Sequence, residues 1–346
     1  MNTVPGKTLL RSFRDPEPNL TDAAILVTGA TGSFGRAFIS AVLARHKPRR
    51  LVVFSRDEFK QFEMAADFPE QKHRAIRFFI GDVRDRDRLE MAMRGIDYVI
   101  HAAALKQVPT AEYNPFECIN TNVLGAENVV QAAIRCSVKR VIALSTDKAA
   151  NPVNLYGASK LASDKIFVAA NHLSGHGGTR FSVVRYGNVF NSRGSVVPLF
   201  NKLFAENAKE IPITDERMTR FWITLDQGVS FVLSCLEMMK GGEIFIPKIP
   251  SMKIVDLASA LAPGIPHSVI GVRPGEKLHE IMITNDDART TIEYNDRYVI
   301  LPSFQVWEDP APLPSTAKPV AENFSYASNT NGEWLDSESL LSIFGK

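Results

Sequence analysis

Apolar residues occur in short, unbroken runs along the first 190 residues of the chain. The runs that predict strands are LVVFS (51–55), IRFFIGDV (76–83), DYVIHAAA (97–104), RVIALST (140–146) and FSVVRYGNV (181–189). Apolar and β-branched runs without alternation are typical of parallel strands that are covered on both faces. Segments with helical spacing separate them, and this repeated order predicts a Rossmann-like, doubly wound parallel α/β sheet over residues 20–190.

Beyond about residue 190 the order of strands and helices becomes less regular, and proline and glycine are more frequent. We expect residues 191–300 to form mainly a smaller, mixed α/β domain that binds substrate, with later segments crossing back to the first domain. Residues 301–346 are expected to form an extended wrap or tail. Within the first domain, Asn114 followed by Pro115 predicts the start of a helix, because proline is favoured at the first helical position.

Composition excludes few classes of protein. The 346 residues carry a formal net charge of +2 without a dense basic cluster, so we expect no nucleic-acid partner. The three cysteines and seven histidines lack the spacing of metal ligands, and free thiols indicate a reducing compartment. No apolar run is long enough for a membrane span, and residues 1–20 do not resemble a signal peptide. We therefore expect a cytoplasmic protein without a metal site.

Glycines follow the first predicted strand in the segment TGATGSFG. Gly29, Gly32 and Gly35 lie where a strand turns into a helix, with Thr31, Ser33 and Phe34 between them. Glycine at these positions allows a tight turn and a close approach of the backbone to a pyrophosphate, and the helix N-terminus favours the negative charge. The segment predicts a dinucleotide-binding loop.

The end of the second strand bears on which dinucleotide is bound. An NAD site usually has a carboxylate here for the ribose 2′-hydroxyl, whereas an arginine suits the 2′-phosphate of NADP. Ser55 and Arg56 stand at this position, Lys60 follows one turn later, and Asp57 keeps NAD as the less favoured alternative. The residues expected along the rest of the cofactor are Asp82 and Val83 at the adenine edge, and Ala102 and Ala103.

The segment STDKAANPVNLYGASK, residues 145–160, carries the candidate chemistry. Tyr156 and Lys160 are four residues apart, so a helix places them on one face, where the ammonium can lower the pKa of the phenol and bind a ribose. Such a phenolate can take a proton from a sugar hydroxyl while hydride leaves the same carbon, and Thr146 can orient that hydroxyl. The Tyr-x-x-x-Lys spacing is a weak signal alone and a strong one behind a dinucleotide-binding loop.

Together these motifs resemble the extended short-chain dehydrogenases/reductases that act on nucleotide sugars. Within that family they resemble most the inverting UDP-N-acetylglucosamine (UDP-GlcNAc) 4,6-dehydratases of the pseudaminic acid pathway. The resemblance covers about residues 20 to 300 and rests on ILVTGATGSFG, HAAALKQVPTAEYNP, STDKAANPVNLYGASKLASDK, VRYGNVFNSRGSVVPLF, DERMTRFWITLDQGV and RPGEKLHEIMI. Related dehydratases often have glutamate in place of Lys148, and some have methionine in place of Tyr156, so the presence of both residues indicates the inverting type.

The resemblance implies a hydro-lyase reaction in three steps. C4 of the sugar is oxidised by bound NADP, water is eliminated across C5 and C6, and hydride returns to C6. The implied products are UDP-2-acetamido-2,6-dideoxy-β-L-arabino-hex-4-ulose and water. Asp147 would protonate the leaving hydroxyl, which requires a raised pKa. Lys148 would be the base at C5, which requires a lowered pKa.

The resemblance also implies substrate contacts outside this segment. We expect Lys106 near the cofactor or the sugar diphosphate, and Asn188 against the substrate. Arg220 and Arg273 would bind the diphosphate, and Glu276 the uridine ribose. The family further implies a homo-oligomer that binds a UDP-sugar.

Two other functions remain open at this level. A UDP-sugar 4-epimerase needs Thr146, Tyr156 and Lys160 but has no use for Asp147 and Lys148. A regulator that senses NADP would keep the fold without catalysis, although it would have no need to retain the tyrosine and lysine.

Overall fold

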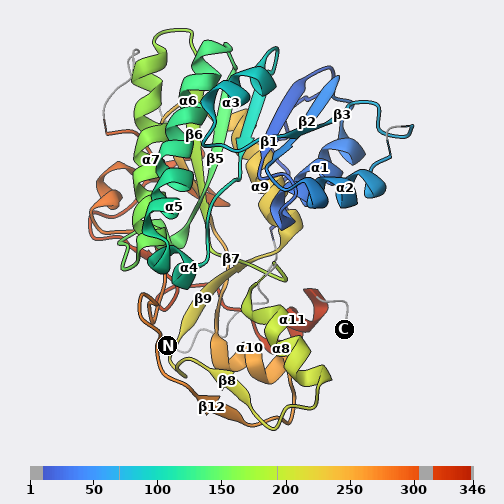
Figure 1. Ribbon diagram of the computed structural model, residues 1–346. Coiled ribbons are helices and arrows are strands. Elements are labelled where there is room, and N and C mark those ends of the chain that lie inside the picture. The colour runs from blue at the N-terminus through green and yellow to red at the C-terminus, as the bar shows by residue number, and fades with distance from the viewer. Residues whose placement is uncertain (1–10, 70, 193, 304–314, 344–346) are drawn as a thin grey trace.

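The structure is a computed structural model that describes residues 11–69, 71–192, 194–303 and 315–343 (Figure 1). Its centre is a ten-stranded sheet. In spatial order the strands are β16 (Lys318–Pro319), β14 (Thr291–Glu293), β15 (Arg297–Ile300), β10 (Ile244–Pro247), β6 (Arg180–Tyr186), β5 (Arg140–Thr146), β4 (Tyr98–His101), β1 (Ala24–Thr28), β2 (Arg50–Ser55) and β3 (Ile76–Ile80). The pairs from β10 to β3 are parallel, and β15, β14 and β16 extend the sheet antiparallel. The predicted doubly wound α/β fold is confirmed.

Helices cover both faces of this sheet (Figure 1). On one face α3 (Arg86–Met93) packs on α6 (Gly125–Arg135), which packs on α7 (Leu155–Ser174). On the other face α1 (Ser33–Arg45) packs on α9 (Leu225–Met238). The shorter α2 (Glu58–Asp67) lies against β2 and β3. All five residues of β1 are buried, which explains why the central strands are continuously apolar.

The direction of winding reverses at β1. From β1 the chain moves outward through β2 to β3, and it then returns to β4 on the other side of β1 and continues to β5 and β6. In open α/β sheets the carboxyl ends of the strands on either side of such a reversal leave a crevice that binds ligands. The glycine loop follows β1, and the segment 145–160 begins at the end of β5.

The predicted helix start at Asn114 is part of a longer irregular stretch. After α4 (Val108–Tyr113), α5 (Pro115–Ile119) begins at the proline, as expected, and Asn114 is its N-cap residue without a side-chain capping bond. A π-helical turn, η1 (Asn120–Leu124), then leads directly into α6. One turn of π-helix in this position adds a residue to the usual helical spacing.

A second hydrophobic core lies below the large sheet in Figure 1. The elements around it are β7 (Asn188–Val189), α8 (Val196–Ala205), β8 (Ile211–Ile213), β9 (Thr219–Ile223), β11 (Ser251–Lys253), α10 (Ile254–Leu261), β12 (His267–Val269) and α11 (Ser337–Ile343). Its buried side chains include Phe200, Trp222 and Leu257. Residues 191–300 also include α9, which packs on α1, and β10, which is a strand of the large sheet. This range therefore contributes both to the large sheet with its helices and to the second core. The domain boundaries stay a prediction.

The last described segments run along both parts of the molecule. β16 lies at the edge of the large sheet, β17 (Tyr326–Ala327) pairs with β13 (Ile281–Ile283), and α11 packs on α10. A short turn, η3 (Asp287–Thr290), precedes β14. Parts of the predicted tail, 304–314 and 344–346, lie outside the described residues, as do residues 1–10 of the expected leaderless N-terminus.

Within the described ranges no helix is both long and apolar enough to cross a bilayer. The three cysteines are free. The same ranges hold no cluster of three or more side chains suited to a metal ion.

Candidate active site

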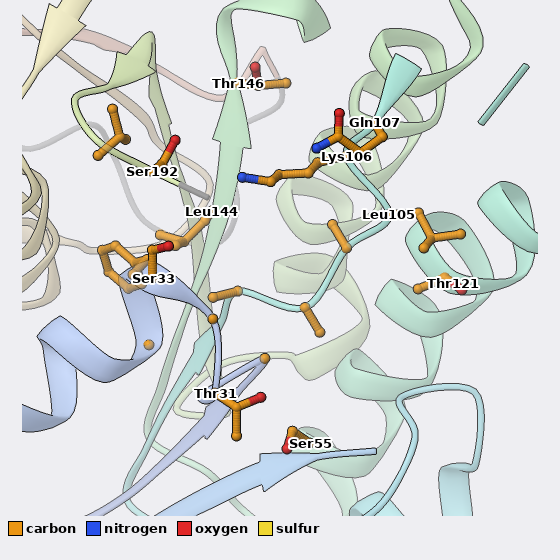
Figure 2. Close-up of a pocket in the computed structure, with 18 of the residues that line it drawn as sticks. Thr31, Ser33, Ser55, Leu105, Lys106, Gln107, Thr121, Leu144, Thr146 and Ser192 are labelled. Carbon is orange, nitrogen blue, oxygen red and sulfur yellow. The ribbon is translucent and has the colours of Figure 1, made fainter. Parts of the chain in front are cut away.

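A cavity of about 680 Å³ opens at the carboxyl ends of β1, β4 and β5. It is lined by the glycine loop, by the ends of β2 and β3 and by the start of α7. Figure 2 shows Thr31 and Ser33 of the glycine loop and Ser55 at the end of β2. The predicted residues that line it are Gly29, Thr31, Gly32, Ser33, Phe34, Gly35, Ser55, Arg56, Asp57, Lys60, Asp82, Val83, Ala102, Ala103, Lys106, Thr146, Lys148, Tyr156, Lys160 and Asn188. One cavity therefore joins the expected cofactor side to the expected catalytic side.

The glycine loop has the shape that a pyrophosphate site needs. Gly29 has φ of +64°, and a Cβ there would lie 2.8 Å from the backbone nitrogen of Ala103. A Cβ on Gly35 would collide with the backbone of Ala30. Helix α1 begins at Ser33, and its N-cap residue, Gly32, makes no side-chain capping bond. The N-terminus of α1 thus presents the positive end of its dipole beside glycines that carry no side chains. This arrangement fits the pyrophosphate of a dinucleotide.

Beyond the loop, Arg56 is the exposed cation at the end of β2. Its side chain is 55% exposed, and its Nη1 lies 3.7 Å from Asp82 Oδ2. Asp57 caps α2 instead of pointing across the cavity: Oδ1 accepts a hydrogen bond from Lys60 N at 3.0 Å, and Oδ2 lies 2.6 Å from Lys60 Nζ. Ser55 Oγ accepts a hydrogen bond from Gln61.

The segments that follow β3, where the adenine edge is expected, and β4 add further lining residues. Asp82 is paired with Arg84 at 2.8 Å, while Val83 is buried. The backbone N–H groups of Ala102 and Ala103 both donate to Thr28 Oγ1 at 3.2 Å, which fixes the chain beside the glycine loop.

Tyr156 and Lys160 lie one turn apart in α7, as predicted. The helix is capped by Asn154, whose Oδ1 accepts from Gly157 N at 2.7 Å, so Tyr156 stands in the first turn beside the cavity. Thr146 ends β5, and its side chain lies close enough to Tyr156 to act on the pKa of the phenol. These three side chains meet at one place although they come from a strand and a helix.

The expected lowering of the tyrosine pKa is wrong. Burial raises the pKa of Tyr156 to about 12, and this effect outweighs the opposing charge of Lys148 and the opposing effect of Thr146. Lys160 is 4% exposed, and burial lowers its own pKa. The cation that acts on the phenol is therefore Lys148.

Asp147 and Lys148 form the turn η2 (Asp147–Ala149) directly after β5. Lys148 Nζ lies 3.1 Å from Asp147 Oδ1, which also accepts a hydrogen bond from Thr146 Oγ1 at 2.9 Å. Asp147 is 1% exposed, and burial raises its pKa, as a proton donor requires. Within the described ranges its other oxygen, Oδ2, is buried without a hydrogen-bond partner.

The expected lowering of the lysine pKa is also wrong. Burial acts in that direction, but the carboxylates of Asp147 and Glu280 outweigh it and raise the pKa of Lys148. Glu280 Oε1 lies 3.0 Å from Lys148 Nζ. The motif RPGEKLHEIMI contained this residue, but nothing in the sequence indicated that it meets Lys148 across 132 positions.

The remaining predicted substrate residues divide into two groups. Lys106 and Asn188 line the cavity, and Figure 2 shows the Lys106 side chain extended into it, on the side of Leu144, Thr146 and Ser192. Burial lowers the pKa of Lys106. Sequence reasoning missed the neighbouring Gln107 and Ser192, which carry no motif of their own.

Arg220, Arg273 and Glu276 are not among the lining residues of the cavity. Arg220 is buried, and its guanidinium donates to the carbonyls of Thr219, Leu278 and Lys277 at 2.8, 3.1 and 2.9 Å. Arg273 is exposed and pairs with Glu276 at 3.3 Å in the loop before β13. The structure thus brings Arg273 and Glu276 together, and Arg220 bonds to the backbone of the residues that directly follow Glu276.

Two curated relatives resemble this chain over most of its length. It is 57% identical to "UDP-N-acetylglucosamine 4,6-dehydratase (inverting)" of Campylobacter jejuni over 92% of this chain and 96% of the relative. It is 46% identical to "UDP-glucose 4-epimerase" of Rickettsia akari over 77% of this chain and 79% of the relative.

Solved structures share the fold. Pen from Bacillus thuringiensis superimposes with a TM-score of 0.85 at 37% identity, over 94% of this chain and 98% of that one. DesIV, a dTDP-glucose 4,6-dehydratase from Streptomyces venezuelae solved with NAD bound, has a TM-score of 0.65 at 24% identity, over 74% and 86%. The family model described as "Polysaccharide biosynthesis protein" matches residues 25–302. The chain therefore belongs to this polysaccharide biosynthesis family, with a short-chain dehydrogenase/reductase fold and with the inverting UDP-N-acetylglucosamine 4,6-dehydratases among its relatives.

Proposed function

We propose that the protein is a UDP-GlcNAc 4,6-dehydratase that inverts C5 of the sugar. The observation that carries this proposal is that Lys148 and Tyr156 line one cavity, while Lys148 also contacts Asp147, which is buried directly behind the lining residues. An enzyme that only oxidises and reduces C4 has no use for an additional acid and base. The identity of 57% to an inverting dehydratase supports the same assignment.

The residues of the cavity fit a nicotinamide dinucleotide, and we assign it as NADP. Gly29, Gly32 and Gly35 would hold the pyrophosphate at the start of α1, and Lys160 the nicotinamide ribose. When bound, this group accepts hydride from C4 of the sugar and returns it to C6. Arg56 supports NADP over NAD, because a guanidinium can pair with a 2′-phosphate.

The protein side chains would move the protons. Tyr156 takes the proton of the C4 hydroxyl, which Thr146 orients. The resulting ketone acidifies the C5 proton, which Lys148 removes. Asp147 protonates the leaving C6 hydroxyl, and its raised pKa suits that role. For inversion, the sugar ring must turn the opposite face of C5 toward Lys148 before this amine returns a proton.

Mass spectrometry of the product tests the reaction. The purified protein with NADP and UDP-GlcNAc should form a product that is lighter by one water. A product of unchanged mass with inverted C4 would instead identify a UDP-sugar 4-epimerase, the second candidate, which the relative from Rickettsia akari favours. Bound cofactor without turnover of any UDP-sugar would identify an NADP-sensing regulator.

We assign the activity to the cytoplasm, to a homo-oligomer and, by family resemblance, to the synthesis of pseudaminic acid. Light scattering on the purified protein tests the oligomer. The presence of pseudaminic acid in cells with and without the gene tests the pathway.

A further inference from the structure

Glu280 is a buried carboxylate in contact with the proposed base. It is 1% exposed, and its Oε1 lies 3.0 Å from Lys148 Nζ and 3.7 Å from Arg220 Nε. Its Oε2 is buried without a hydrogen-bond partner among the described residues. A buried carboxylate is costly unless charged or donor groups compensate for the lost water, so its presence beside Lys148 calls for a physical reason.

The fold holds Glu280 firmly at this place. Its backbone N–H donates to Ser328 Oγ at 2.9 Å, and its carbonyl accepts from Ser328 N at 2.8 Å. The preceding loop is tied to the turn that carries Lys148, because Lys277 Nζ donates to Ala150 O at 2.7 Å. The strand β13 that follows Glu280 also contacts η2. The carboxylate is therefore presented to Lys148 by fixed backbone on both sides.

An adjacent acid and base create a chemical difficulty that Glu280 can resolve. If Asp147 and Lys148 were alone, the carboxyl would give its proton to the amine and both would be in the wrong state for elimination. A second carboxylate offers the ammonium another partner at 3.0 Å, against 3.1 Å for Asp147. Asp147 can then keep its proton for the leaving hydroxyl.

Building on the function proposed above, we propose that Glu280 is a positioning residue that holds Lys148 in place and accepts its excess proton. An N–H bond of Lys148 breaks and an O–H bond forms on Glu280 Oε1, which leaves the amine neutral. The lone pair of Lys148 then takes the C5 proton while Asp147 protonates the leaving hydroxyl. After Lys148 has returned a proton to C5, Glu280 gives its own proton back to the amine. The proton that Tyr156 took from the C4 hydroxyl replaces the one that Asp147 gave to the leaving water, so the cycle balances.

The charges around Glu280 make it the counterion of Lys148 before the proton moves. Lys148, Arg220 and Lys277 face it as cations, and Asp147 faces it as the other carboxyl. Burial acts to raise the pKa of Glu280, but Lys148 and Arg220 outweigh it and lower this pKa. The pKa of Asp147 is raised. In the resting protein Glu280 is therefore the ionised counterion, and Asp147 is the carboxyl that retains a proton more readily.

The variants Glu280→Gln and Glu280→Asp test the proposal in the full chain with NADP and UDP-GlcNAc. Glutamine keeps the size but cannot accept the proton, so kcat for loss of water should fall about 100-fold with little change in KM. Because Lys148 must then lose its proton to solvent, the remaining kcat should rise with pH. The wild-type kcat should not show this rise. Aspartate should restore the wild-type pH profile and part of kcat. Glu243→Gln, another buried carboxylate that bonds to Ser182 at 2.6 Å, is the control for lost stability.

A second measurement is independent of turnover. The titration of Lys148 is followed by nitrogen NMR of its side chain in the NADP complex, with the signal assigned through Lys148→Met. Glu280→Gln should lower the pKa of Lys148 by about one unit or more, and Glu243→Gln should leave it unchanged. An unchanged lysine pKa, or a kcat loss no greater than that of Glu243→Gln with the wild-type pH profile, would overturn the role of Glu280. If the wild type removes no water from UDP-GlcNAc, the proposed function fails, while the NMR result still decides whether Glu280 controls the proton of Lys148.

Discussion

Asp57 directs its carboxylate onto Lys60 of its own helix. One oxygen accepts from Lys60 N at 3.0 Å, and the other lies 2.6 Å from Lys60 Nζ. Lys60 hydrogen-bonding lowers the pKa of Asp57, which marks a carboxylate that is already satisfied. An acid in this state is poorly placed to bind a ribose 2′-hydroxyl, whereas the neighbouring Arg56 is half-exposed at the mouth of the cavity. This pairing is the structural argument for NADP.

Replacing Arg56 with alanine should therefore weaken NADP binding far more than NAD binding. A lost charge-assisted contact to the 2′-phosphate should cost about 1.5–3 kcal/mol. Isothermal titration with both dinucleotides measures the two affinities. Arg135→Ala is a matched control, because its side chain is also 55% exposed but does not line the cavity. Equal losses for NADP and NAD would show that Arg56 is only a surface charge.

The layout of the cofactor side was predictable because its signals are local. Gly29, Gly32 and Gly35 are close in sequence, and the turn that they form depends on backbone shape alone. Arg56 was predictable from its position at the end of a strand, whereas the capping bond of Asp57 was not predicted. Its spacing to Lys60 contains that information, since an N-cap carboxylate accepts from a residue three positions later.

The charge balance of the catalytic side was not predictable in the same way. The pKa of Lys148 depends on Glu280, which directly precedes a different strand. The sequence around either residue gives no indication that the two side chains meet. The role expected for Arg220 also depended on its surroundings, and in the fold its donors are directed to backbone carbonyls. Long-range contacts of this kind follow from tertiary packing and have no local pattern.

Replacing Lys148 with methionine should stop the elimination but not the oxidation of C4. The variant keeps Tyr156, Lys160 and the glycine loop, so NADP should still bind. Without a base at C5, the reduced cofactor should accumulate during one turnover, and its near-ultraviolet absorbance measures this directly. Lys165→Met, at an exposed position of α7, should behave as the wild type. Release of the 4-keto-6-deoxy product at a near wild-type rate would exclude Lys148 as the base.

The same variant should lose stability in a manner that depends on pH. Removing one partner of a buried ion pair leaves a carboxylate uncompensated and should cost about 3 kcal/mol near neutral pH. Lys148 lowers the pKa of Glu280 below its ordinary value of 4.5, so the stabilisation is present above pH 4.5 and disappears as the pH falls through the folded value. Thermal unfolding of both proteins should thus differ most near pH 7 and converge in acid. A difference that stays constant with pH would contradict this coupling.

Replacing Tyr156 with phenylalanine should block the first step instead. Loss of the proton acceptor at C4 should lower kcat by at least about 100-fold, while NADP binding stays within a small factor. No reduced cofactor should accumulate, in contrast to Lys148→Met. Tyr113→Phe, at a tyrosine that is 87% exposed on α4, is the matched control. Accumulation of reduced cofactor in Tyr156→Phe would assign the C4 proton to another group.

The fate of one hydrogen separates the dehydratase from the epimerase. A C5 proton that is removed and replaced by the exchangeable amine of Lys148 must mix with solvent, whereas hydride that returns from the cofactor stays with the sugar. Turnover of UDP-GlcNAc in deuterated water should therefore place deuterium at C5 of the product and the original C4 hydrogen at C6. The configuration at C5 should be opposite to that of the substrate. An epimerase would change only C4 and leave C5 unlabelled. A dehydrated product without deuterium at C5 would exclude an exchangeable base there, and with it the assignment of Lys148.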